Sequence, residues 1–133
     1  MEPSSFLLHL YFLERLAVSA AFAIPLLVAL SSLRKGRSKE ESSALSYVVL
    51  GFAIGFLGNI LGGLAGAYLY RLPLLPLELR RAGLSASAIA RTVFVYNTAF
   101  KVFYIASLFA SLSLVGYGVY KMASIRDHAT GTS

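Results

Sequence analysis

The chain has 133 residues, a formal net charge of +6 and a hydrophobic content of 57%, while 14% of its residues are charged. Soluble domains carry about a quarter charged residues, so this composition predicts an integral membrane protein rather than one with a water-facing surface. Cysteine is absent, which excludes disulfides, thiolate catalysis and Cys-ligated metal sites.

The first apolar stretch covers about 6–33, where about 20 residues suffice to cross a bilayer. It follows an acidic rather than a basic start, and it is longer than the apolar core of a signal peptide. We therefore expect a retained transmembrane helix. Glu14 and Arg15 are the charged residues within it.

A short basic connection, 34–41, leads to the second apolar stretch at about 45–70. No Asp, Glu, Lys or Arg occurs from Ser42 to Tyr70, which is the strongest transmembrane signal in the chain. Glycines follow one face of this predicted helix, and such rows permit close approach between helices in lipid. They predict a helix-packing or oligomer face, within or between chains, with a narrow pore lining as the alternative. The row consists of Gly51, Gly55, Gly58, Gly62 and Gly66.

Two prolines, Pro73 and Pro76, are expected to end the second helix. From about 76 to 90, apolar and polar residues alternate at helical spacing, which predicts an amphipathic helix on the membrane surface. The third apolar stretch covers about 92–122, and a polar tail follows at 123–133. The sequence thus predicts an all-α fold with three transmembrane helices, as a single membrane domain over 1–133.

Polar residues interrupt the third stretch on one helical stripe. Lys101 is the most informative, because a lysine deep in a bilayer costs about 2.5–3.5 kcal/mol on insertion scales. Counted from the same membrane side, Glu14 lies at a similar depth, so we hypothesise a Glu14–Lys101 pair with Asn97 and Tyr104 as neighbours. The alternatives are a structural pin between helices, snorkelling of Lys101, contact with a partner subunit, and a proton or ion relay.

Basic residues are expected to face lipid phosphates beside the spans, and nucleic-acid binding is not predicted. Six of them lie on the side of the first connection and the tail, against three to five on the other side. This bias predicts a multi-pass protein of the cell membrane with its N-terminus outside and its C-terminus in the cytoplasm. Tyrosines are expected at the two membrane interfaces: Tyr47, Tyr117 and Tyr120 at one, and Tyr11, Tyr68 and Tyr70 at the other.

The sequence contains no phosphate-binding glycine loop, serine elbow or metal-spaced histidine cluster. We therefore expect no enzymatic activity, no cofactor and no metal. The predicted function is that of a small non-catalytic membrane subunit, which assembles with itself or with a larger membrane complex through its glycine-rich face. The alternative is a small oligomeric channel or transporter with Glu14, Asn97 and Lys101 along its path.

Overall fold

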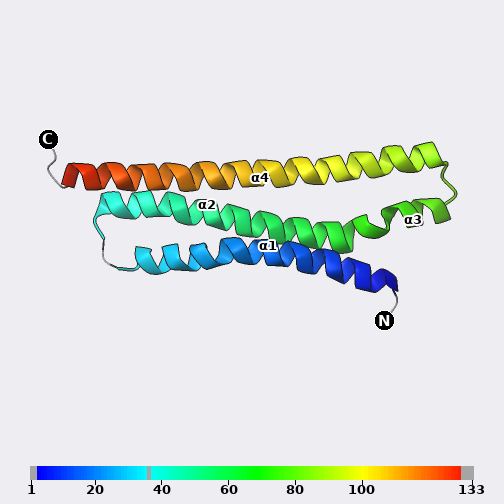
Figure 1. The fold of residues 1–133 in the computed structure, drawn as a ribbon, viewed down its shortest axis with the longest axis horizontal. Helices are drawn as coiled ribbons and strands as arrows, with labels where there is room; N and C mark the ends of the chain where they lie inside the picture. The colour runs from blue at the N-terminus through cyan, green and yellow to red at the C-terminus, as the bar shows by residue number, and fades with distance from the viewer. Residues whose placement is uncertain (1–2, 36, 130–133) are drawn as a thin grey trace. The chain divides into compact units, whose positions relative to one another are not determined.

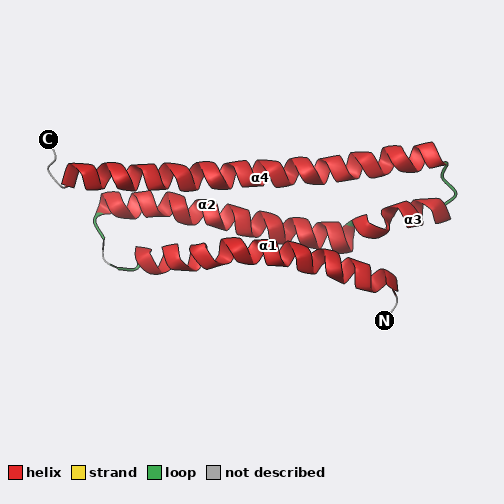
Figure 2. Cartoon of the chain, viewed as in Figure 1, coloured by secondary structure: helices red, strands yellow, loops and turns green. Residues whose placement is uncertain are grey.

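A computed structural model describes residues 3–35 and 37–129, and within these residues the chain is all-helical (Figure 2). Of the described residues, 92% lie in helices and none in a strand, which confirms that the fold is all-α. The elements follow one another along the chain as labelled in Figure 1. They are α1 (Pro3–Leu33), α2 (Lys39–Leu64), the π-helix η1 (Ala65–Leu69), the 3₁₀ helix η2 (Leu72–Leu74), α3 (Leu75–Arg81) and α4 (Ala86–Ala129).

Three of these helices are long and apolar enough to cross a membrane by length and composition. The stretches are Ser5–Leu33, Lys39–Leu69 and Ala86–His128, and an 18-residue window within each has a mean hydropathy of 2.2, 2.0 and 1.8, respectively. This confirms three apolar helices of spanning length, which is compatible with a multi-pass membrane protein. The third is longer than the sequence predicts, since α4 begins before residue 92 and continues beyond residue 122.

Contacts divide the described chain into two units, and each unit contains segments of α1, α2 and α4. The first unit comprises Gly58–Ala106 with the part of α1 up to Val18. The second comprises Ser19–Leu57 with the part of α4 from Ser107 onward. Each unit has its own contacts between the three helices, and the single membrane domain stays a prediction.

The fully buried residues of both units are small, and many large apolar residues are exposed. Ser19, Ala44 and Ser111 in the second unit are fully buried, whereas Phe109 is 73% exposed. In the first unit Ala67 is fully buried, whereas Leu69 is also 73% exposed. Helices in lipid are packed in this way, because hydrocarbon does not drive large side chains inward and small ones let backbones approach.

Local side-chain and backbone hydrogen bonds set the helix ends. Ser38 accepts a hydrogen bond from the Glu41 N–H at 3.2 Å and thereby caps α2, with Glu41 at the acidic position of a capping box. Ser85 caps α4 in the same way, since its hydroxyl accepts the Ala88 N–H at 3.3 Å. Gly83 has φ +86°, a left-handed conformation that glycine adopts without strain.

The helix predicted over 76–90 is therefore wrong as one continuous element. Gly83 ends α3, with the Leu84 N–H donating to the Leu79 carbonyl at 3.3 Å, as in a Schellman motif. The residues from Ala86 onward belong to α4 instead. Sequence periodicity continued through this break, because a left-handed glycine changes the chain direction without changing the apolar pattern.

Replacing Gly118 by alanine is expected to destabilise the second unit. The added Cβ would lie 2.6 Å from Val48 Cγ2 and 2.7 Å from the Ala44 carbonyl oxygen. Overpacking of this kind costs about 1–3 kcal/mol of unfolding free energy. Thermal unfolding in one detergent, followed by circular dichroism, measures the change.

Gly116→Ala is the matched control on the same helix. A Cβ at Gly116 meets nothing within 4 Å, so this variant is expected to gain up to about 1 kcal/mol from helix propensity. Equal melting temperatures for the two variants would contradict the close approach of α2 and α4 at Gly118.

Candidate functional site

In the second unit, the first two glycines of the row contact different neighbours. Gly51 is buried against α4, where a Cβ would lie 2.7 Å from both the Ser111 carbonyl oxygen and Val115 Cγ2. Gly55 is buried against α1, where the Phe22 ring fills the space that a Cβ would need. These two glycines thus allow both neighbouring helices to approach α2.

In the first unit, the end of α2 and η1 pack on α1 in the same manner. Gly66 is buried against Tyr11, whose ring and hydroxyl would lie 2.8 Å from an added Cβ. Gly63, beside the predicted row, lies against Arg15 with a corresponding distance of 2.7 Å to the Arg15 Cβ. Gly58 is half-buried. At Gly51, Gly55 and Gly66 the glycine row is therefore covered by helices of its own chain.

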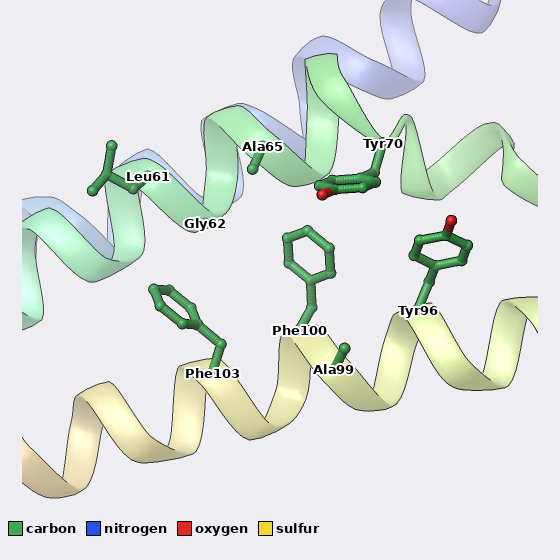
Figure 3. A pocket seen from close by; sticks show the side chains of 8 residues that line it. All are labelled: Leu61, Gly62, Ala65, Tyr70, Tyr96, Ala99, Phe100 and Phe103. Carbon is green, nitrogen blue, oxygen red and sulfur yellow. The ribbon is translucent and has the colours of Figure 1, made fainter.

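The π-helix η1 follows the end of α2 and closes with a π-turn, which changes the direction in which the next side chains point. The Tyr70 N–H donates to the Ala65 carbonyl at 2.8 Å, five residues back instead of the usual four. Tyr70 then meets α4, with its ring centroid 5.7 Å from that of Tyr96 and 5.5 Å from that of Phe100 (Figure 3). This places three aromatic rings together within the first unit.

Beside these rings lies an open apolar hollow of about 380 Å³ between the end of α2 and α4. It exists because Gly62, Ala65 and Ala99 line its middle with little or no side chain (Figure 3). Leu61 and Phe103 line the other end. An added Cβ at Gly62 would make only an ordinary contact of 3.7 Å with Phe103, so here the row faces space rather than a neighbouring backbone.

A second hollow, of about 560 Å³, lies between α3 and the start of α4. Arg80 contributes its charge to an otherwise apolar lining that includes Ile89 and Val93. Arg71, by contrast, forms an ion pair with Glu78, with Arg71 Nε 3.0 Å from Glu78 Oε1. Both partners of that pair are well exposed, so it contributes at most about 1 kcal/mol to stability.

Arg15, rather than Glu14, is the half-buried charged residue of α1 that contacts aromatic rings of the first unit. Its guanidinium carbon lies 5.6 Å from the Tyr11 ring centroid and 5.1 Å from the Tyr104 ring centroid. Both distances are within the range of cation–π interaction. Tyr104, predicted as a neighbour of a Glu14–Lys101 pair, thus contacts the adjacent arginine instead.

Glu14, Asn97 and Lys101 are all exposed. No ion pair between Glu14 and Lys101 is found among the described residues, so the hypothesised pair is not formed within this part of the chain. The depth argument placed the two charges at similar heights, but it could not say which way each side chain points around its helix.

In the second unit, Lys121 has a partner inside the chain. Its Nζ donates to Ser43 Oγ at 2.9 Å and lies 5.5 Å from the Tyr47 ring centroid. Tyr47 in turn makes an edge contact with Tyr117, at a centroid distance of 4.8 Å. In the first unit, the Tyr68 hydroxyl oxygen lies 2.8 Å from His9 Nδ1. The two predicted tyrosine groups therefore supply contacts in different units, while their membrane interfaces stay predictions.

No group of three or more His, Cys, Asp or Glu residues that could hold a metal ion is found in residues 3–35 and 37–129. Comparison with protein-family models, with curated proteins and with solved structures finds no match to this chain. Its function must therefore be inferred from its own geometry.

Sequence reasoning missed Arg15 as a packing residue and missed the aromatic hollow. The residues that form the hollow are visible in the sequence, since Gly62, Ala65 and Ala99 are small and aromatic residues lie nearby in the chain, at Tyr70, Tyr96 and Phe100. This pattern could not be used without knowing that the end of α2 faces this part of α4. The π-turn that directs Tyr70 toward α4 has no sequence signature of its own.

Replacing Arg15 by glutamine is expected to lower the unfolding free energy by about 1–2 kcal/mol, since both ring contacts of the guanidinium are lost. Thermal or SDS-induced unfolding in a mild detergent measures this loss. Glu14→Gln is the control at the adjacent position: measured on the monomeric chain, it should stay within about 0.5 kcal/mol of the parent, because Glu14 is exposed there. A larger loss for Glu14→Gln than for Arg15→Gln would overturn this assignment.

Proposed function

We propose that this protein is a small non-catalytic integral membrane subunit that assembles with itself or with a larger membrane complex. The observation that carries the proposal is the outward exposure of Glu14 on α1 and Lys101 on α4, with no ion pair between them. Charged side chains are costly in hydrocarbon unless they find partners or reach the surface. A second chain that supplies opposite charges would remove this cost.

A second copy of the same chain is the simplest partner. In a two-fold symmetric dimer, residue i of one copy contacts residue j of the other, and the reverse contact forms at the same time. Glu14 of each copy would then meet Lys101 of the other, giving two equivalent ion pairs. Asn97 is exposed one turn before Lys101 and would add hydrogen bonds at the same surface.

The glycine row supports this proposal in a changed form. Gly51, Gly55 and Gly66 lie against helices of their own chain, so their part is to hold the three helices close together. The proposed contact surface is instead the polar surface at Glu14, Asn97 and Lys101. These three residues line neither of the hollows described above, so a channel path along them is the less supported alternative.

Charge reversal at either position is expected to weaken the dimer about tenfold or more, because like charges would then face each other twice. The variants are Glu14→Lys and Lys101→Glu, each measured alone by its mass in detergent or nanodiscs. Co-expression of the two variants should restore a mixed dimer, in which both pairs are again of opposite charge. Differently sized tags on the two chains identify the mixed species.

Arg91→Glu serves as a control, since it reverses an exposed charge elsewhere on α4 and should leave the mass unchanged. Failure of the co-expressed variants to associate would refute the reciprocal pair. A stoichiometric foreign protein that co-purifies with the parent and is lost with Lys101→Glu would favour the larger-complex form of the proposal. Ion or proton flux in liposomes that disappears with Lys101→Met would instead favour the channel.

The proposed location is the cell membrane, with the N-terminus outside and the C-terminus in the cytoplasm. Support comes from the larger number of lysines and arginines in the first connection and the tail. On this arrangement the connection between α3 and α4 lies outside.

Because the chain has no cysteine, single introduced cysteines can report this orientation. An impermeant maleimide added to intact cells should label Ala82→Cys but should label Ser38→Cys only after permeabilisation. Both residues are exposed and uncharged, so neither substitution alters the charge bias. Labelling of Ser38→Cys alone in intact cells would reverse the orientation.

A further inference from the structure

The two hollows of the first unit follow the same face of α4. Val93 lines the hollow beside α3, and Tyr96 lines the aromatic one three residues later. Residues three and four apart are neighbours on a helix surface. The lining continues along α4 with Phe100 and Phe103, so that both hollows lie along one face of this helix.

The length of this face fits one leaflet of a bilayer. Ten helical steps separate Val93 from Phe103 along α4, which is about 15 Å at a rise of 1.5 Å per residue. The hydrocarbon core of a bilayer is about 30 Å thick, so one leaflet contributes about 15 Å. A single acyl chain of ordinary length would therefore lie along this face.

The hollow beside α3 is positively charged. Arg80 lines the hollow beside α3, and among the described residues it forms no ion pair. Glu78, the acidic residue of the same short helix, is engaged by Arg71. The local charge thus favours an anion at the Arg80 end, while the aromatic end is apolar.

We infer that the first unit binds one anionic phospholipid along α4, with its phosphate at Arg80 and one acyl chain in the hollow lined by Tyr70, Phe100 and Phe103. A guanidinium matches the geometry of a phosphate and is weakly hydrated, whereas Gly62, Ala65 and Ala99 leave the width that a chain needs. The π-turn after α2 completes the site by placing Tyr70 over Phe100 (Figure 3). This inference rests on the proposed membrane location but not on assembly with a partner.

Native mass spectrometry of the full chain tests the inference. The protein in micelles is titrated with phosphatidylglycerol or phosphatidylcholine, which are given the same acyl chains and differ in headgroup charge. We expect one phosphatidylglycerol per chain, bound about tenfold more tightly than phosphatidylcholine. Both lipids offer Arg80 a phosphate for a charge-assisted hydrogen bond, but only the phosphatidylglycerol headgroup has a net negative charge. The same spectra report the number of chains as a separate quantity, so a failure of the assembly proposal would be seen independently.

Two matched pairs of variants locate the lipid. Arg80→Gln should remove the preference for phosphatidylglycerol, while Arg81→Gln, at the adjacent exposed position outside the hollow, should keep it. Ala65→Phe should fill the hollow and weaken both lipids about tenfold, while Ala106→Phe, on an exposed part of α4, should not. Equal losses for the two arginine variants would indicate diffuse surface attraction and overturn the site. Unchanged binding by Ala65→Phe, or equal affinity of the parent for both lipids, would also overturn it.

Discussion

Close approach of helix backbones through very small residues is the constraint on which the rest of this structure depends. At Gly51 and Gly118 a single added carbon would overlap backbone atoms of the facing helix, and at Gly66 it would overlap the Tyr11 ring. Fully buried positions such as Ala44, Ser19 and Ala67 are equally small. Many large apolar side chains are consequently left exposed, as expected for the proposed membrane location. The same constraint explains why α2 carries more glycines than α1 or α4, since α2 contacts both of them.

Packing of this kind leaves little room for charges inside, and it separates two adjacent residues of α1. Neighbours on a helix point about 100° apart, so Arg15 and Glu14 cannot face the same surroundings. The Arg15 side chain lies against Gly63, and its guanidinium contacts the rings of Tyr11 and Tyr104. Glu14 is left exposed, as is Lys101 on α4. The proposed assembly surface thus includes Glu14 because Arg15, its neighbour in the chain, is the one of the two charged residues that packs against the aromatic rings.

The exceptions to close packing are as informative as the rule. Where Gly62 and Ala65 face Ala99, the helices do not close on one another, and aromatic rings border the space that remains. The π-turn at the end of α2 contributes to this opening because it turns the Tyr70 side chain toward α4. This apolar space, with Arg80 in the neighbouring hollow along α4, suits an amphiphile better than a second helix. Assembly through exposed charges and lipid binding along α4 would therefore use different surfaces of the same small unit.

The sequence by itself determined the all-helical class and the three long apolar helices, because runs of uncharged residues and helix-length hydrophobicity are local properties. It also identified the glycines and the polar residues at 14, 97 and 101. It joined α3 to the start of α4 wrongly, since the left-handed turn at Gly83 leaves the apolar periodicity intact. Only the tertiary structure decided which helix each glycine faces, that Arg15 rather than Glu14 turns inward, and that Lys101 stays outside. These outcomes depend on the rotation of each helix about its axis, which is fixed by contacts between residues far apart in the chain.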